Sequence, residues 1–128
     1  MKTYLAVSVA MLTGMAIGGF AVQGLHAQAK PPVYYVAEIE ITNVDAYTKE
    51  YSPKAIALTK QMGGKILAAG QNAKAIEGDP PKSRIVIQQW ESMDKLMAWR
   101  NSAEYKENRK IGEKYAKFRV FAIEGVAQ

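Results

Sequence analysis

Apolar and polar positions alternate in some stretches after residue 30 and recur at three- and four-residue spacing in others. Alternation is typical of half-buried strands, whereas the longer spacing is typical of amphipathic helices. Ile39 and Ile41, for example, fall on one face of an alternating stretch, with Glu38 and Glu40 on the other. We expect strands over residues 34–41, 65–69, 84–90 and 118–123, with residues 73–77 forming either a short further strand or only an extended segment.

A helix is predicted between the first two strands. Its apolar face consists of Tyr47, Tyr51, Ala55, Leu58 and Met62. Asn43 or Asp45 is placed to cap its start, and Gly63 can end it with a positive φ. Pro53 interrupts the apolar pattern, but Ser52 followed by Pro53 is also a good helix start. We therefore expect a kink, or two short helices end to end.

A second helical region begins at Ser92 and breaks near Ser102, before the last strand. The order strand, helix, strand, strand, helix, strand is the split β-α-β pattern of ferredoxin-like α+β domains. It predicts an antiparallel sheet with both helical regions on one face. Because the strands are strongly apolar, the other face needs a cover, and a second copy of the sheet supplies one. We therefore expect a homodimer.

The first 29 residues have the pattern of a signal peptide. Lys2 precedes a charge-free apolar run over residues 5–22, and Ala27, Gln28 and Ala29 provide a small-x-small cleavage site. Cleavage leaves a single domain over residues 30–128, periplasmic or secreted, without stable membrane association. The alternative is an uncleaved anchor, since 18 apolar residues approach the length that spans a bilayer.

Composition excludes several classes of chemistry. The chain has no cysteine, and its one histidine, His26, leaves with the signal peptide. The remaining domain cannot build Ser-His-Asp or Cys-His catalytic groups, a His-ligated haem or the usual zinc sites. We expect no cofactor and no metal. Loss of Lys2 lowers the net charge from +5 to +4, and outside the cytoplasm nucleic acid is not an expected partner.

A few polar and aromatic side chains are candidates for a ligand site. Glu77 and Arg84 flank a turn, where a facing carboxylate and guanidinium would bind a polar substrate or only pin a hairpin. Tyr47 and Tyr105, with Trp90, would line a pocket between helices and sheet, or simply pack in the core. Phenol hydroxyls in such a pocket can donate to a carbonyl or enolate oxygen.

The C-terminal third is rich in cations. They are Arg100, Lys106, Arg109, Lys110, Lys114, Lys117 and Arg119. Such a cluster attracts anionic ligands or surfaces. Glutamates at positions 104, 107 and 113 interleave with it, which favours a solvated, salt-bridged helix face instead.

Five short motifs in order resemble one known family. They lie at residues 42–47, 62–68, 76–79, 102–105 and 123–125. The family is the domain of unknown function 1330, within the dimeric α/β-barrel superfamily. This resemblance implies a ferredoxin-like protomer and a dimer whose sheets face each other, with no established reaction. The superfamily also contains cofactor-free monooxygenases, lactone isomerases and haem enzymes.

The chain departs from that family at the end of the strand before the second helical region. Members often carry a glutamate followed by an aromatic residue there, whereas this chain has Gln89 and Trp90. Gln89 cannot act as a general base in place of a glutamate, although it can still contact a ligand.

Two hypotheses follow from these residues. In the first, the dimer is a binding or interaction module without catalysis. In the second, it is a cofactor-free isomerase or monooxygenase acting on a small organic molecule. The sequence assigns no catalytic residue. Its candidates for binding a ligand are Tyr47, Glu77, Arg84, Gln89 and Tyr105.

Overall fold

Four strands form one antiparallel sheet in the computed structural model, which describes residues 30–128. The strands are β1 (Val33–Ile41), β2 (Lys65–Gly70), β3 (Arg84–Trp90) and β4 (Ala116–Glu124). Their order across the sheet is β2-β3-β1-β4, and every neighbouring pair is antiparallel. The two longest strands therefore lie side by side, with β1 in the interior of the sheet.

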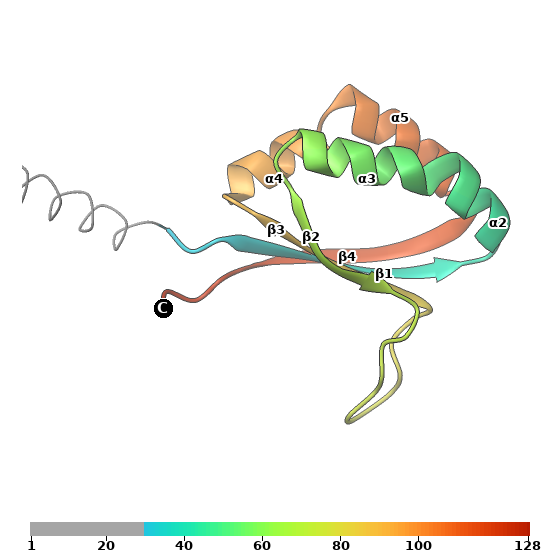
Figure 1. The fold of residues 1–128 in the computed structure, drawn as a ribbon, viewed down its shortest axis with the longest axis horizontal. Helices are drawn as coiled ribbons and strands as arrows, with labels where there is room; N and C mark the ends of the chain where they lie inside the picture. Colours follow the sequence, from blue (N-terminus) through green and yellow to red (C-terminus); the bar gives the residue numbers. More distant parts are fainter. Residues whose placement is uncertain (1–29) are drawn as a thin grey trace, which may run out of the picture. The chain divides into compact units, whose positions relative to one another are not determined.

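The helices all cover one face of this sheet (Figure 1). The first helical region consists of α2 (Val44–Ala46), a π-helical segment η1 (Tyr47–Tyr51) and α3 (Ser52–Gln61). The second consists of α4 (Met93–Arg100) and α5 (Ala103–Gly112). The predicted ferredoxin-like α+β fold is confirmed, because the element order and the one-sided cover are those of that fold.

The helix boundaries follow from capping side chains. Asn43 accepts a hydrogen bond from the backbone N–H of Ala46 at 3.1 Å. Ser92 and Ser102 cap α4 and α5 in the same way, each at 3.2 Å. Pro53 lies in the first turn of α3, directly after η1, and its missing N–H removes one helical hydrogen bond at this junction. The residues just before this proline, Tyr47–Tyr51, form a wide π-helical turn. The regular α-helix is therefore interrupted next to Pro53, where a kink or two short helices were expected.

Residues 73–77 form no strand. They belong to a long loop between β2 and β3 that projects from the sheet on the side away from the helices (Figure 1). The sequence left open whether this stretch is a short strand or only an extended segment, and the structure shows that it is not a strand. Gly78 in this loop adopts a φ of 80°, which side chains disfavour.

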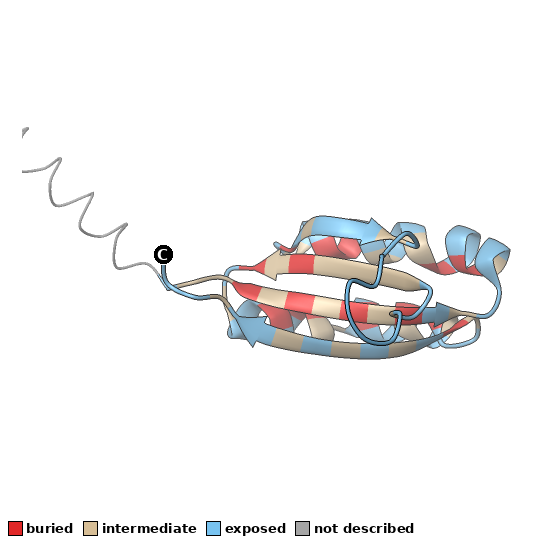
Figure 2. Cartoon of the chain, turned by 90° about the horizontal axis from the view of Figure 1, so that it is seen from below, coloured by how far each residue is buried: buried red, intermediate tan, exposed pale blue. Residues whose placement is uncertain are grey.

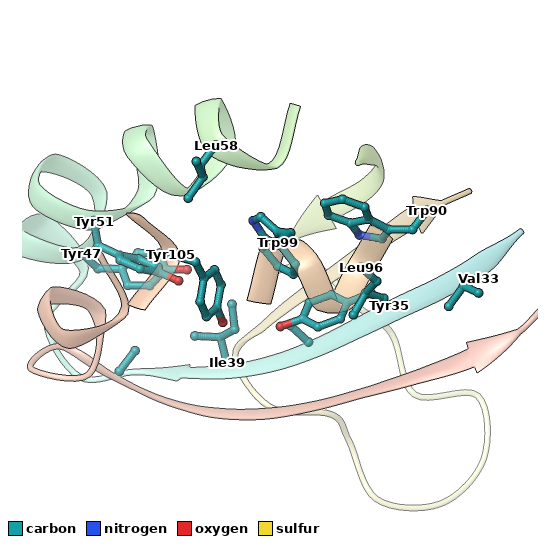
Figure 3. Packing of buried hydrophobic residues seen from close by; sticks show 12 residues of the cluster. Val33, Tyr35, Ile39, Tyr47, Tyr51, Leu58, Trp90, Leu96, Trp99 and Tyr105 are labelled. Atoms are coloured by element: carbon teal, nitrogen blue, oxygen red, sulfur yellow. The ribbon is translucent and has the colours of Figure 1, made fainter. Parts of the chain in front are cut away.

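The core lies between the helices and the inner face of the sheet. Alternation along β1 buries Val33, Tyr35, Ala37 and Ile39. Aromatic rings dominate this layer (Figure 3). The Trp99 ring contacts three others, and its centroid lies 5.2 Å from that of Tyr35, 5.0 Å from Trp90 and 4.7 Å from Tyr105.

The opposite face of the sheet, here the open face, carries no helix (Figure 2). Large apolar side chains remain accessible on it, with Leu67 47%, Phe121 45% and Ile123 61% exposed. Arg119 and Glu38 form an ion pair across β1 and β4 on the same face.

The signal peptide or anchor predicted for residues 1–29 lies outside the described residues. Within residues 30–128, no helix is long and apolar enough to cross a membrane.

Candidate active site between the helices and the sheet

A cavity of about 120 Å³ lies between the inner face of the sheet and the helices η1, α3, α4 and α5. The sheet contributes alternate residues of β1 and β3, such as Tyr35 and Arg84. The helices contribute Tyr47, Trp99 and Tyr105, among others. Most of the wall is apolar or aromatic, with a few polar groups set into it. This composition is typical of sites for small organic molecules.

Local structure explains why these side chains converge. Tyr35 points inward because β1 alternates. Tyr47 and Tyr51, four residues apart, share one side of the π-helical turn. On α5, Tyr105, Asn108 and Gly112 recur at three- and four-residue spacing and face the sheet as buried residues.

Two arginines connect three of the tyrosine hydroxyls. Arg109 Nη1 donates to the hydroxyl oxygen of Tyr105 at 3.0 Å and to that of Tyr51 at 3.5 Å. Arg100 Nη1 donates to the hydroxyl of Tyr35 at 3.4 Å and also to that of Tyr105. Figure 3 shows the tyrosine hydroxyls directed toward a common space between the helices and the sheet. We call Tyr35, Tyr51, Tyr105, Arg100 and Arg109 the Arg–Tyr cluster.

Arg109 is not part of a solvated helix face. Its side chain is only 15% exposed, and its guanidinium lies 3.4 Å from the centroid of the Phe118 ring. Its ion pair with Glu113 is long, at 3.9 Å, and Glu113 is itself largely exposed. The sequence interpretation of the C-terminal cations as a solvated face is therefore wrong for Arg109, because α5 turns this residue toward the sheet.

Burial keeps the tyrosines protonated. It raises the pKa of Tyr47 and of Tyr105 to about 12, and it raises the pKa of Tyr35 and of Tyr51. Neighbouring arginines favour the phenolate and oppose this effect, but desolvation of the charged form is the larger influence. At neutral pH these side chains are therefore neutral phenols that can donate a hydrogen bond.

Three buried polar atoms of the described residues have no hydrogen-bond partner: Arg84 Nε, Trp99 Nε1 and Asn108 Oδ1. All three residues line the cavity. They come from β3, α4 and α5, and two of them are nearly inaccessible, with Trp99 4% and Asn108 3% exposed. Leaving such a group unpaired costs about 1–3 kcal/mol, so three around one space need an explanation.

The structure brings some of the predicted ligand-binding residues together and separates others. Tyr47, Arg84 and Tyr105 line the cavity. Glu77 does not, because it lies exposed in the loop between β2 and β3. Gln89 does not either, since alternation along β3 directs its neighbour Gln88 inward instead. No ion pair joins Glu77 to Arg84 within the described part of the chain. That these residues bind a ligand stays a prediction.

Sequence reasoning missed several lining residues. These are Tyr35, Tyr51, Gln88, Trp99, Asn108 and Arg109. A signal for part of this set was present, because Asn108 and Arg109 follow Tyr105 at three- and four-residue spacing and so share its side of a helix. Trp99 lies in the core and its ring forms part of the cavity wall, while its indole N–H is buried without a partner.

No group of three or more histidine, cysteine or acidic side chains within residues 30–128 is placed to hold a metal ion. What the cavity wall contains instead is a set of guanidinium and phenol groups among apolar side chains. Such groups bind oxygen atoms of a ligand and stabilise negative charge on them.

Comparison with solved structures supports the fold. The RPA0582 protein of Rhodopseudomonas palustris is 15% identical, with a TM-score of 0.60 over 83% of this chain and 90% of that chain. SnoaB, a cofactor-independent oxygenase from Streptomyces nogalater, is 9% identical, with a TM-score of 0.57 over 77% and 96%. A dimeric protein of unknown function and ferredoxin-like fold from Bacteroides fragilis is 13% identical, with a TM-score of 0.53 over 73% and 96%.

Among curated proteins, none matches the sequence significantly. The family described as "Domain of unknown function (DUF1330)" matches residues 32–126, which is nearly all of the part that the structure describes. The sequence motifs, the ferredoxin-like topology and this match agree, and the chain belongs to the DUF1330 family.

Proposed function

We propose that this domain binds a small, partly apolar organic molecule in the cavity between its helices and its sheet. The observation that carries the proposal is that three residues of one largely apolar cavity wall, Arg84, Trp99 and Asn108, each contain a buried polar atom without a hydrogen-bond partner. Small side-chain movements would let a ligand with acceptor atoms pair with the unpartnered donors of Arg84 and Trp99.

The size of the cavity limits the ligand. A volume of about 120 Å³ is several times the minimum that holds one water, about 10–15 Å³. A small compound, such as a single ring with a short polar substituent, suits a space of this size. The rings of Trp99 and Tyr105, which meet edge to face, offer it an aromatic wall.

Catalysis without a cofactor is a second candidate function. The specific observation in its favour is the Arg–Tyr cluster, whose neutral phenols can donate to an oxygen that gains charge in a transition state. SnoaB, of similar fold, is described as a cofactor-independent oxygenase. Proton abstraction also needs a base, however, and no carboxylate, lysine or histidine occurs among the described lining residues. This favours binding over catalysis.

We also propose that the protein is a homodimer joined through the open face. Three large apolar side chains on this face are between 45% and 61% exposed. Exposed apolar patches on a sheet are typical of interfaces. The Bacteroides fragilis protein of similar fold is described as dimeric.

We also propose that the protein is exported, and this proposal rests on the sequence of residues 1–29 alone. Cleavage after Ala29 would deliver the domain to the periplasm or the exterior. There it would act as a binding module for a compound that reaches the cell surface.

The test is a thermal-shift screen of single-ring and short-chain compounds against the domain over residues 30–128. Ala55 lines the cavity on α3, and Ala57 lies exposed on the same helix, so Ala55→Leu and Ala57→Leu form a matched pair. We expect compounds that raise the Tm of the wild type and of Ala57→Leu but not of Ala55→Leu. Hits that persist in Ala55→Leu, or a screen without hits, would contradict binding in this cavity.

A further inference from the structure

The cavity contains more positive charge than its own residues neutralise. Arg84 and Arg109 line it. Arg100 does not line it but donates hydrogen bonds to the hydroxyls of Tyr35 and Tyr105, which do. None of the described lining residues is acidic. The one ion pair that these arginines make within residues 30–128 is the 3.9 Å contact of Arg109 with Glu113, which is 64% exposed. A contact of this kind is weak and screened by solvent.

The tyrosines do not supply the missing negative charge. Because burial holds the pKa of Tyr47 and Tyr105 at about 12, their phenolates are not populated at neutral pH. Their hydroxyl oxygens accept hydrogen bonds, and for Tyr105 both donors are guanidinium groups. A hydroxyl whose oxygen accepts from two cations directs its own proton elsewhere, and the Tyr105 hydroxyl donates toward that of Tyr35, which also lines the cavity.

Donors therefore outnumber acceptors around this space. Arg84 Nε–H and Trp99 Nε1–H are buried donors without partners, and only Asn108 Oδ1 is an unpartnered acceptor. Burial of an unneutralised cation is costly, whereas a bound anion with hydrogen bonds offsets that cost. The charge and the donor excess favour the same kind of ligand atom, a negatively charged oxygen.

A second hollow, the outer groove, borders the cavity on the solvent side of α4 and α5. Its volume is about 360 Å³, and Arg100, Tyr105 and Arg109 of the Arg–Tyr cluster form part of its wall. Lys106 adds a further cation to this wall, whereas Lys110 is paired with Glu107 at 3.3 Å, and the acid of the wall is Glu113. Tyr105 therefore stands between an exposed cationic groove and a buried cationic cavity. Such a groove concentrates anions from solution beside the cavity.

We propose that the ligand is a small organic anion, a carboxylate or an enolate on a compact apolar body. Its charged oxygen accepts from Arg84 and from the phenols that Arg100 and Arg109 hold, while its apolar body lies against Trp99. This inference rests on the proposed function and adds the chemical class of the ligand. It also assigns the outer groove as the side from which the anion reaches the cavity.

The test compares acids with their neutral amides of the same shape. Benzoate with benzamide, cinnamate with cinnamamide, and hexanoate with hexanamide are matched pairs of suitable size. Binding to the wild-type domain is followed by Tm and by tryptophan fluorescence, to which Trp99 in the cavity wall contributes. We expect at least one acid to bind ten-fold or more tightly than its amide.

Variants locate the charge that matters. Arg84→Gln removes one positive charge at the cavity, and Lys54→Gln removes one from an exposed position on α3. We expect Arg84→Gln to lose at least ten-fold in affinity for the acid and Lys54→Gln to lose less than two-fold. Arg84→Lys, which keeps the charge but not the guanidinium geometry, recovers part of the loss. The comparison of acid with amide on the wild type stands even if Arg84→Gln fails to fold.

The outcomes separate the two proposals. Amides that bind as tightly as their acids would overturn the anion inference and leave cavity binding intact. Equal weakening by Arg84→Gln and Lys54→Gln would also overturn it, since the acid would then respond only to net charge. If no member of any pair binds and the wider screen has no hit, the proposed function itself fails.

Discussion

The two faces of the sheet carry side chains in the reverse of the usual arrangement. The inner face, which the helices cover, encloses polar groups. Arg84, Trp99 and Asn108 each have a buried polar atom without a partner, and the tyrosine hydroxyls share two arginines. The open face exposes Phe121, Ile123 and Leu67. Buried polar groups and exposed apolar patches are the informative exceptions in a folded protein. The proposed ligand would pair with the polar groups of the inner face, and the proposed second protomer would cover the apolar side chains of the open face.

Loss of Trp90 would damage the inner face most. Trp90 is 1% exposed, packs on Trp99 and donates to Gln88 Oε1 at 2.9 Å. We expect Trp90→Ala to lower the free energy of unfolding by about 3–5 kcal/mol, because a large cavity replaces the ring. Urea denaturation followed by circular dichroism measures the loss. A change below about 1 kcal/mol would contradict the assignment of this residue to the core.

A charge on the open face should break assembly without unfolding the protomer. We expect Phe121→Asp to raise the dimer dissociation constant about 100-fold, since the carboxylate would be buried against apolar side chains. Sedimentation velocity and circular dichroism together separate dissociation from unfolding. Lys54→Gln on α3 is the control, and an unchanged dimer in Phe121→Asp would show that the copies do not meet through this face.

Two arginines allow a direct comparison of the faces. Arg109 and Arg119 each lie over a phenylalanine ring, but the Arg109 side chain is 15% exposed and that of Arg119 is 73% exposed. In an Ile123→Asp background, which keeps the Phe121 ring, we expect Arg109→Ala to lower the free energy of unfolding by about 1–3 kcal/mol and Arg119→Ala by less than about 1 kcal/mol. If the two substitutions lowered the stability equally in thermal denaturation, Arg109 would be no more buried in effect than Arg119, and the contrast between the faces would fail.

High pH should weaken the inner face selectively. Since the pKa of Tyr47 and Tyr105 is about 12 in the folded protein, the unfolded chain ionises these phenols first, near pH 10. The contribution is therefore present below pH 10 and is lost as the pH rises toward 12, by about 1 kcal/mol for each tyrosine at pH 11. Urea denaturation at pH 8, 10 and 11 checks this. A Tyr47→Phe, Tyr105→Phe double variant should show a smaller decline.

Much of the fold could be predicted because its signals are local. Asn43, Ser92 and Ser102 cap helices as expected, and Gly63 adopts the positive φ, 103°, that ends the first helical region. The alternation around Ile39 correctly predicted which side of β1 is buried. Each of these depends on a few neighbouring residues, so the sequence carries the information directly.

The candidate site was predicted only in part. Tyr47 and Tyr105 were found because aromatic residues on an apolar helix face point toward a core. Glu77 was paired with Arg84 across a turn that the chain does not form, because residues 73–77 run into a long loop. Gln89 was chosen for its place in a family pattern, whereas strand alternation turns Gln88 inward.

The sequence by itself determined the elements, their order and the exclusion of thiol and imidazole chemistry from residues 30–128. Periodicity, capping and composition suffice for those conclusions, since each acts over one or two turns of chain. Only the tertiary structure decided that Arg84, Trp99 and Asn108 leave polar atoms unpaired around one space. Their positions come from strand pairing and from the docking of α4 and α5 on the sheet. Whether a buried group finds a partner depends on contacts between segments far apart in the chain, and no local pattern records them.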